Sequence, residues 1–298
     1  MDKKCILHSD LENISVLKSH MHGLVKYFRW HIEKLSSLLR FNISGTGKRL
    51  TIFFNIHAYF KNMPERVYLD DEQNFVIRAN GVQKYFISPK SAKWGFWSGI
   101  SGRGKSIGSG YFLDLIEFND GDLIIDCGAQ VGDLLIYFEN HKIKIEYVGF
   151  EPSFAEFKCL LKNTAPHKVQ NFGLWHESNI LEFYVSSLNA DSSFIEPKEF
   201  TRIVKVPVKR LDEVERRRIK LLKLEAEGAE IEVLRGCENI LRNIEYIAAD
   251  CGFERGIKEE NTFPDVINYL TARGFMVLKM IAPSGRNTVL FYNTKFTV

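Results

Sequence analysis

Acidic side chains gather in one short stretch, residues 223–230, which reads Lys-Leu-Glu-Ala-Glu-Gly-Ala-Glu. The apolar run before it predicts a buried strand, so these acids come at the carboxyl end of that strand. Because side chains alternate between the faces of a strand, Lys223 and Glu225 share one face, joined by Glu227 if the strand continues. Crowded carboxylates have raised pKa values, which suits general-base catalysis or cation binding. In the alternative, structural interpretation, Lys223 neutralises Glu225 and Glu230 stabilises the start of a helix.

A further acid, Asp250, ends the next apolar run and leads into a loop that contains Glu254 and Arg255. The carboxyl ends of neighbouring parallel strands meet at one edge of a sheet, so we expect Asp250 to lie beside the acids of residues 223–230. Glu254 and Arg255 are candidate substrate-binding residues on that loop. The alternative for this Glu-Arg pair is a buried structural ion pair.

A strand, a tight turn and a helix are predicted around residues 123–132, Leu-Ile-Ile-Asp-Cys-Gly-Ala-Gln-Val-Gly. The apolar run ends at Asp126, and Gly128 lets the backbone approach a ligand with no side chain in the way. The spacing of Gly128 and Gly132 differs from the Gly-x-Gly-x-x-Gly pattern that binds pyrophosphate, which argues against NAD. A cofactor without phosphates, such as S-adenosylmethionine, suits this turn better. Asp126 could organise the ammonium group of that cofactor or its water, or it could cap the strand.

Glu151 ends the following strand, about 20 positions beyond Gly132, where an acid can accept hydrogen bonds from ribose hydroxyls. Together with the turn at 128–132, this acid favours a cofactor that contains a ribose. The alternative role for Glu151 is a charge at the amino end of the helix that Pro152 and Ser153 begin.

A glycine-rich run over residues 98–110 includes Gly-Ile-Ser-Gly-Arg-Gly-Lys-Ser at 99–106, a formal match to the phosphate-binding loop Gly-x4-Gly-Lys-Ser. That loop needs a buried strand before it and a helix after it. The preceding strand signal is weak, and the glycines that follow are expected to break the helix. A nucleotide hydrolase that uses Lys105 and Ser106 is therefore the less favoured alternative. We instead expect a substrate-side loop in which Arg103 and Lys105 meet an anionic group, or a plain linker.

A polar segment separates the third and fourth predicted strands and contains two strand-like pieces, at 181–185 and 203–206. Within it, Asp191, Ser192 and Ser193 could form hydrogen bonds with substrate or cofactor. A surface turn explains the same three residues almost equally well.

Strand and helix patterns alternate from residue 122 to the end of the sequence. Strands are expected at 122–127, 145–151, 168–173, 219–225, 244–250, 275–281 and 287–293, and helices at 131–141, 153–163, 229–241 and 262–273. This alternation predicts an α/β fold with a parallel sheet and right-handed crossovers.

The first third of the chain has a different pattern. Residues 14–38 carry apolar side chains at three- and four-residue steps, typical of an amphipathic helix with a basic polar face. Such a helix could pack on the domain, on a second copy of the chain, or on a membrane surface. Residues 66–88 alternate like strands, and Asn80-Gly81 predicts a two-residue hairpin loop. We divide the chain into an N-terminal helix with a small β extension, 1–95, and a main domain, 96–298.

The composition is that of an ordinary globular protein, with 298 residues, of which 45% are hydrophobic and 26% charged. A net charge of +3 is too small to indicate nucleic-acid binding. Neither a signal peptide nor a span of about 20 apolar residues is evident, so we expect a cytoplasmic protein, with the helix over 14–38 allowing peripheral contact with the inner face of the membrane. The five cysteines are scattered, which predicts reduced thiols and no metal site.

Several motifs, taken in order, resemble those of the FkbM-type S-adenosylmethionine-dependent methyltransferases. They are residues 126–132 (Asp-Cys-Gly-Ala-Gln-Val-Gly), residues 150–152 (Phe-Glu-Pro), residues 222–236 with their acids and Val-Leu-Arg-Gly end, and Asp250 with residues 254–256 (Glu-Arg-Gly). The resemblance runs from about Gly99 to the carboxyl terminus. Its first part, 99–111, is similar to the lead-in of members associated with polysaccharide and glycolipid modification.

The resemblance implies a class I methyltransferase sheet of seven strands with the last one antiparallel, S-adenosylmethionine as cofactor, and O-methylation of a hydroxyl, often on a sugar, glycolipid or nucleotide sugar. A sugar hydroxyl is a weak nucleophile at neutral pH, so a nearby base is useful. The cofactor-binding candidates are Asp126, Gly128, Ala129, Gly132, Glu151, Pro152 and Leu174. The substrate-binding candidates are Arg103, Asp191, Ser192, Ser193, Glu254 and Arg255.

Our hypothesis is that Glu227 or Asp250 takes the proton of the acceptor while Glu225 positions the substrate. Two positions depart from the family pattern, since many members have Asp in place of Glu225 and Asn in place of Gln130. The first change keeps the acid but moves it outward by one methylene, so a metal or base role is not transferred to Glu225. A non-catalytic binding protein on the same fold is the remaining alternative.

Overall fold

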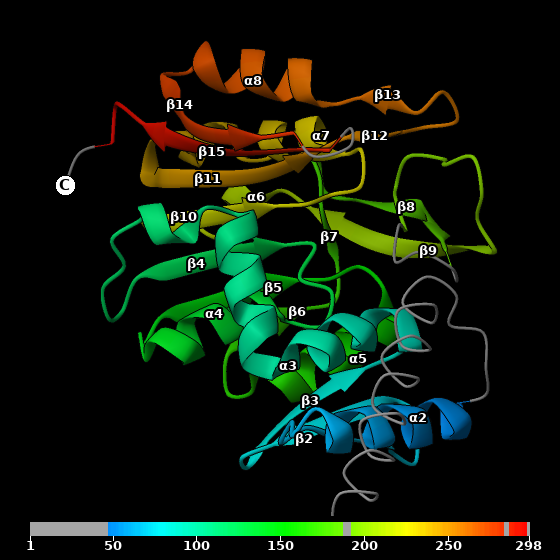
Figure 1. Ribbon diagram of the computed structural model, residues 1–298. Coiled ribbons are helices and arrows are strands. Elements are labelled where there is room, and N and C mark those ends of the chain that lie inside the picture. Colours follow the sequence, from blue (N-terminus) through cyan, green and yellow to red (C-terminus); the bar gives the residue numbers. More distant parts are fainter. Residues whose placement is uncertain (1–46, 187–191, 283–285, 297–298) are drawn as a thin grey trace, which may run out of the picture.

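The computed structural model describes residues 47–186, 192–282 and 286–296. Its centre is a seven-stranded sheet with the order β14-β15-β11-β10-β4-β5-β6 (Figure 1). The strands are β4 (Leu123–Cys127), β5 (Glu146–Phe150), β6 (Lys168–Gln170), β10 (Ile219–Leu224), β11 (Ile244–Cys251), β14 (Phe275–Ile281) and β15 (Asn287–Asn293). Strands β11, β10, β4, β5 and β6 run parallel, and β15 is antiparallel to both of its neighbours. The predicted α/β fold with seven strands and an antiparallel last strand is confirmed.

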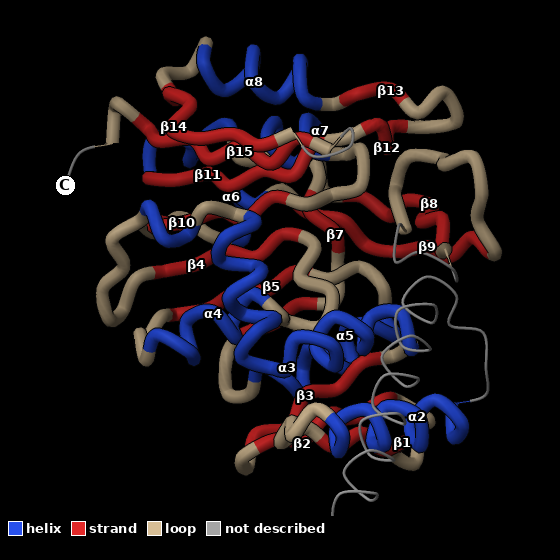
Figure 2. The backbone as a smooth tube through the Cα atoms, viewed as in Figure 1, coloured by secondary structure: helices blue, strands red, loops and turns tan. Residues whose placement is uncertain are grey.

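Helices cover both faces of this sheet (Figure 2). They are α4 (Leu134–His141), α5 (Phe154–Thr164), α6 (Leu211–Val214), α7 (Glu230–Arg235) and α8 (Phe263–Thr271), with short 3-10 helices at Leu113–Leu115 and Glu238–Asn243. Because strand side chains alternate, Ile124 packs in the core with α4 and α5, whereas Ile125 packs in the core with α7 and α8. The apolar strands are therefore buried on both sides, as a parallel sheet requires.

A small sheet and a helix precede the main sheet. They comprise α2 (Gly47–Phe60), β1 (Arg66–Leu69), β2 (Phe75–Ala79) and β3 (Val82–Phe86), with strand order β1-β2-β3. The predicted hairpin is confirmed, since β2 pairs with β3 across Asn80 and Gly81, which both have positive φ. Asn163 of α5 donates to the carbonyl oxygen of Tyr85 at 2.9 Å and accepts from its N–H at 2.7 Å, which fixes β3 to the main domain.

The glycine-rich run is helical, so the prediction of a loop or linker over 98–110 is wrong. It belongs to α3 (Pro89–Gly110), which crosses the predicted boundary at residue 95 and kinks at Gly99. A Cβ atom at Gly104 would lie 2.6 Å from Asn140 Nδ2, and one at Gly108 would lie 2.3 Å from the Tyr137 ring. These glycines therefore let α3 pack closely against α4. The phosphate-loop interpretation fails too, because residues 99–106 lie inside this helix instead of between a strand and a helix.

The polar segment after β6 forms a second small sheet beyond the carboxyl ends of the central strands (Figure 1). It contains β7 (Gly173–Leu174), β8 (Asn179–Val185) and β9 (Arg202–Lys209) in the order β7-β9-β8. The predicted strand at 168–173 is thus split, since β6 joins the central sheet and β7 joins this one. A short hairpin of β12 (Phe253–Arg255) and β13 (Glu260–Asn261) lies at the same end.

The predicted amphipathic helix over 14–38 lies outside the described residues. Within the part of the chain that the structure does describe, no helix has the length and apolar character needed to cross a membrane.

Candidate functional site

A cavity of about 290 Å³ opens at the carboxyl ends of β4, β5 and β10, the edge at which the sequence predicts a ligand. Its walls come from the turn after β4, the end of β5, the residues after β10, helix α3 and the small sheet of β7 and β8. The predicted site residues that line it are Arg103, Gly128, Glu151, Pro152, Leu174, Ser192, Glu225 and Glu227. The fold therefore brings cofactor, substrate and catalytic candidates from distant parts of the sequence to one hollow.

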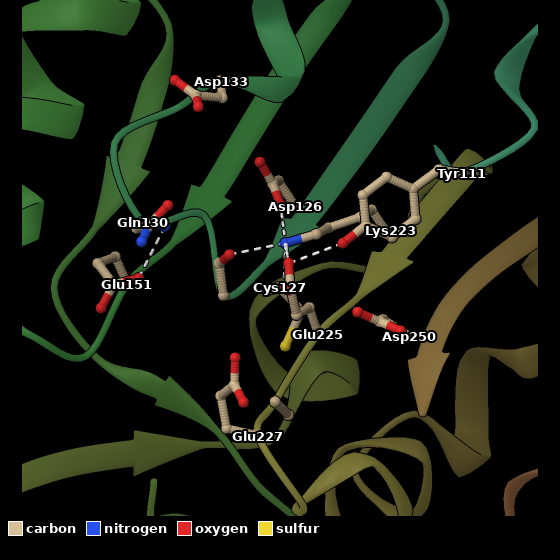
Figure 3. A network of polar contacts seen from close by, with 12 residues as sticks. Tyr111, Asp126, Cys127, Gln130, Asp133, Glu151, Lys223, Glu225, Glu227 and Asp250 are labelled. Atoms are coloured by element: carbon tan, nitrogen blue, oxygen red, sulfur yellow. Dashed lines mark hydrogen bonds and ion pairs between the residues drawn. The ribbon is translucent and has the colours of Figure 1, made fainter. Parts of the chain in front are cut away.

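A buried ammonium group ties the ends of β4 and β10 together at this edge (Figure 3). Lys223 Nζ lies 3.2 Å from Asp126 Oδ1 and 2.9 Å from Glu225 Oε2, and it donates to the carbonyl oxygen of Gly128 at 2.7 Å. Burial alone would lower the pKa of Lys223, but the two carboxylates outweigh it and hold this pKa well above its ordinary value. Lys223 is thus a cation at any ordinary pH, and it holds the two strand ends together.

The turn after β4 approaches β10 so closely that residue 128 has no space for a side chain. Gly128 has a φ of +70°, and a Cβ atom there would lie 2.0 Å from the carbonyl oxygen of Glu225. Gln130, two residues later, also has a positive φ of 49° and donates its N–H to Glu151 Oε2 at 2.8 Å. The turn consequently exposes backbone, not side chains, to the cavity at Gly128.

Glu151 is only 6% exposed, yet its carboxyl group lines the cavity. It accepts the N–H of Gln130 at Oε2 and the N–H of Ser153 at Oε1, both at 2.8 Å. Burial, with a smaller contribution from Glu156, raises the pKa of Glu151 to about 8. The hydrogen bond from the Ser153 N–H gives Glu151 the alternative role, at the start of helix α5. Glu151 also lies on the cavity wall, where a residue that binds a ribose would have to lie.

Three of the cofactor-binding candidates shape the turn from behind and do not line the cavity. Asp126 is 1% exposed and is bound by Lys223 and by the Tyr147 hydroxyl, which donates to Oδ2 at 2.7 Å. Ala129 is buried in the core with α4. A Cβ atom at Gly132 would lie 2.5 Å from Thr164, so this glycine permits contact between the turn and α5.

The catalytic candidates surround a cation that the sequence analysis missed. Arg286 lies just before β15, and its guanidinium group is close to the carboxylates of Glu254 (2.5 Å), Asp250 (3.3 Å), Glu227 (3.6 Å) and Glu225 (3.9 Å). The structure thus brings all three catalytic candidates together, as their positions at strand ends predict. One arginine shared by four acids leaves an excess of negative charge at this end of the sheet.

The acids of this cluster differ in pKa. Burial alone would raise the pKa of Glu225, but Lys223 and the Tyr111 hydroxyl, which donates at 2.7 Å, hold it below its ordinary value. The predicted rise is therefore wrong for Glu225, and the structural interpretation of its pairing with Lys223 is right. Burial and the nearby Glu225 charge raise the pKa of Asp250. Glu225 therefore stays ionised, and a carboxylate with so low a pKa is a weak base.

Glu227 occupies a special backbone position between β10 and α7. It has a left-handed φ of 48°, and its carbonyl oxygen accepts the Ser193 hydroxyl at 2.7 Å. Glu230 holds the same turn by accepting the N–H groups of Ala226 at 3.0 Å and Gly228 at 3.1 Å. The turn is therefore fixed from both sides, which presents Glu227 to the cavity.

The remaining substrate candidates are divided. Arg103 of α3 lines the cavity and pairs with Asp133 at 2.6 Å. Arg255 instead binds Glu232 at 2.8 Å and Glu254 pairs with Arg286, so the alternative of an ion pair between Glu254 and Arg255 does not hold. Asp191 lies outside the described residues.

Several cavity residues were not predicted. They are Ser91, Cys127, Gln130, Phe150, Ser153, Glu156, Gly173, Phe183, Phe194, Ala226, Ala229 and Arg286. The residues among them that directly precede or follow a predicted site residue could have been included by extending each motif by one position. Arg286 has no such signal, because it comes from the last hairpin and reaches the site only through the antiparallel pairing of β15.

Among residues 47–186, 192–282 and 286–296, no group of three or more His, Cys, Asp or Glu side chains is arranged to hold a metal ion. The four cysteines in these ranges, Cys127, Cys159, Cys237 and Cys251, are buried and unpaired by disulfides.

Comparisons with known proteins find methyltransferases. A family model described as the methyltransferase FkbM domain matches residues 126–277. Methyltransferase 1 of Beauveria bassiana (strain ARSEF 2860) is 28% identical over 155 residues, which cover 42% of this chain and 62% of that protein. Methyltransferase sdnD of Sordaria araneosa is 24% identical over 257 residues, which cover 66% of this chain and 96% of that protein. The solved structure of methyltransferase FkbM from Methylobacillus flagellatus KT is 18% identical, with a TM-score of 0.44 over 60% of this chain and 45% of that one.

Proposed function

Since the chain belongs to the FkbM methyltransferase family, we propose that it transfers a methyl group from S-adenosylmethionine to a hydroxyl group of a sugar or glycan. The observation that carries this proposal is the cavity at the carboxyl edge of β4, β5 and β10, with Gly128 and Glu151 on one wall and Glu225 and Glu227 on another. One wall suits the cofactor, and the other supplies acids for the acceptor.

The residues of the cavity fit S-adenosylmethionine without any phosphate-binding device. Gly128 presents bare backbone on the cavity wall, with no side chain between it and a ligand. Glu151 offers carboxyl oxygens for ribose hydroxyls, and Phe150 and Leu174 provide apolar walls for the adenine ring. Arg103 lines the cavity from α3, and since its Nε–H binds Asp133, the other N–H donors of its guanidinium group suit the carboxylate of the methionine part.

Glu227 is the residue that we assign as the general base. When bound, S-adenosylmethionine supplies a methyl carbon that forms the new bond to the acceptor oxygen, while the carbon–sulfur bond breaks and its electron pair stays on sulfur. The proton of the hydroxyl goes to Glu227, which lines the cavity on a fixed turn. Asp250 pairs with Arg286 at 3.3 Å and acts on the site through that arginine.

Glu225 has a positioning role in this proposal. Lys223 and Tyr111 hold it as an anion, so it does not accept the proton. The Glu225 carboxylate lies at the cavity edge, where it can accept a hydrogen bond from an acceptor hydroxyl and stabilise the positive charge of the sulfonium group. Alignment of the reacting groups in a site shielded from water supplies the remaining rate enhancement.

Two measurements on the full chain test the proposal. Calorimetric titration with S-adenosylhomocysteine should show one site per chain. Incubation with methyl-labelled S-adenosylmethionine and a panel of glycans, glycolipids and nucleotide sugars should then transfer label to an acceptor. Failure to bind S-adenosylhomocysteine would overturn the cofactor assignment. If the protein binds it but transfers the labelled methyl group to a non-sugar hydroxyl or an amine and to none of the sugars, the acceptor assignment is overturned. Binding with no transfer at all would favour the non-catalytic alternative.

A further inference from the structure

A second cavity, of about 490 Å³, adjoins the first one. Glu227 and Arg286 line both cavities, so the two hollows meet at the residue that we assign as the base. The outer walls of the second cavity are the segment 197–201, which leads into β9, and the β12–β13 hairpin. A molecule that fills the second cavity would therefore reach Glu227.

The outer walls combine aromatic rings with hydrogen-bonding groups. Phe200 is 39% exposed and Phe253 is 56% exposed, and they come from the two different walls. Large apolar rings left open to solvent beside a polar cleft are typical of binding surfaces. Two such rings can pack against the apolar faces of a sugar ring, while carboxylates accept hydrogen bonds from its hydroxyls.

The charge of this cavity is negative. Four carboxylates line it, those of Glu199, Glu227, Glu254 and Glu259, against two cations, Lys198 and Arg286. Both cations are already paired, since Lys198 lies 3.3 Å from Glu259 and Arg286 lies 2.5 Å from Glu254. An incoming anion would therefore meet more carboxylates than cations. Like charges placed together at a binding surface oppose association.

We propose that the second cavity is the acceptor site, and that it takes an uncharged sugar ring and rejects acceptors that carry a phosphate, pyrophosphate or carboxylate near the accepting hydroxyl. This inference rests on the proposed function and narrows it. Neutral glycans are substrates, and nucleotide sugars and uronic acids are not. The ring packs between Phe200 and Phe253 and presents one hydroxyl to Glu227.

The test uses the full chain saturated with S-adenosylhomocysteine and two readouts, saturation-transfer NMR for acceptor binding and label transfer from S-adenosylmethionine for turnover. The panel pairs each neutral methyl glycoside or oligosaccharide with its sugar phosphate, nucleotide sugar or uronic acid counterpart. We expect the neutral member to bind and to have a kcat/KM at least about tenfold higher than its anionic counterpart. Binding of the anionic members alone, equal or better use of them, or no binding by any neutral ring overturns the inference.

Variants locate the site. Phe253→Ala and Phe200→Ala should raise the acceptor KM about tenfold or more and weaken the NMR signal, with the Kd for S-adenosylhomocysteine unchanged within about twofold. Tyr59→Ala, which removes an even more exposed aromatic ring on α2, should change neither value. Glu199→Lys should raise the use of anionic relative to neutral acceptors about three- to tenfold, whereas Glu117→Lys on the distant surface should not. An unchanged acceptor KM in both phenylalanine variants overturns the placement of the acceptor in the second cavity. If the unmodified chain does not bind S-adenosylhomocysteine at all, that result contradicts the proposed function instead.

Discussion

Lys223 and Asp126 lie directly opposite each other on neighbouring strands, with Nζ 3.2 Å from Oδ1 and side chains only 6% and 2% exposed. The sequence places an acid at the end of β4 and a lysine at the corresponding position of β10, and the parallel register brings them together. Glu225, which directly follows the end of β10, shares the same ammonium group at 2.9 Å. The site is thus built on a buried charge cluster that sets the geometry of the turn above it.

Removing this ammonium group should destabilise the fold strongly. Lys223→Met keeps the length of the side chain but leaves the buried Asp126 and the partly exposed Glu225 without their shared cation, so we expect the free energy of unfolding to fall by about 3–5 kcal/mol. Urea denaturation followed by circular dichroism measures the change. The matched control is Lys158→Met, which breaks an exposed pair with Glu72 and should cost at most about 1 kcal/mol. Equal losses in the two variants would contradict the structural role of Lys223.

Gly128 and Gly121 separate the effect of close approach from that of backbone conformation. Both have a positive φ, +70° and +90°, but a Cβ atom would lie 2.0 Å from a carbonyl oxygen at Gly128 and would meet nothing within 4 Å at Gly121. Gly121→Ala should cost about 1–2 kcal/mol from the left-handed backbone alone. Gly128→Ala should cost several kcal/mol and abolish S-adenosylhomocysteine binding, because the turn must move away from β10. Similar unfolding curves for the two variants would show that the turn is not confined by β10.

The central sheet could be predicted from the sequence because its signals are local. Each buried strand is an apolar run, and an acid or glycine marks the point where the chain leaves the sheet, as at Asp126 and Glu151. The carboxyl ends of parallel strands then meet by topology, which is why Glu225, Glu227 and Asp250 could be placed together before their distances were known.

Helix α3 and Arg286 could not be predicted in the same way. The glycines of α3 indicate a loop by propensity, but Gly104 and Gly108 are there because α4 packs against them. Tertiary contact thus overrides the intrinsic preference of glycine. Arg286 enters the site only through the pairing of β15 with β11, a long-range contact for which its own segment carries no periodic signal.

Glu151 should make stability depend on pH. Its pKa is raised to about 8 in the folded protein, from an ordinary value near 4.5, so the folded state keeps a proton that the unfolded state releases between these values. The contribution of this group to the free energy of unfolding therefore falls as pH rises from about 4.5 to 8, by at most about 1.4 kcal/mol per pH unit. Urea denaturation at pH 5, 6, 7 and 8 should show a shallower decline in Glu151→Gln than in the unmodified protein. The control, Glu117→Gln, changes an exposed acid and should keep the slope of the unmodified protein. If Glu151→Gln also kept that slope, the carboxyl group of Glu151 would be ionised throughout this pH range, which would contradict the raised pKa.

Arg103 and Lys105 lie on the same helix but only Arg103 lines the cavity. Arg103→Ala removes a charged hydrogen-bond donor and should weaken S-adenosylhomocysteine binding about tenfold or more. It should leave the affinity for 5′-methylthioadenosine, which lacks the amino-acid end, unchanged within about twofold. Lys105→Ala should bind both ligands normally. Calorimetry measures all four affinities, and an equal loss for both ligands in Arg103→Ala would indicate damage to the fold, not loss of a carboxylate partner.

Glu227 is predicted to accept the proton, and its amide variant separates this role from binding. Glu227→Gln keeps the shape of the side chain but cannot take up a proton, so kcat should fall about 10²- to 10⁴-fold while the Kd for S-adenosylhomocysteine stays within about twofold. Asp250→Asn acts only through Arg286, so its loss of kcat should be about tenfold or less, and Glu182→Gln on the exposed β8 strand should have no effect. Steady-state label transfer gives kcat, and calorimetry gives the Kd. If Glu227→Gln kept near-normal turnover and Asp250→Asn lost it, the general base would be Asp250. Near-normal turnover in both variants would mean that alignment of the reacting groups alone drives the reaction.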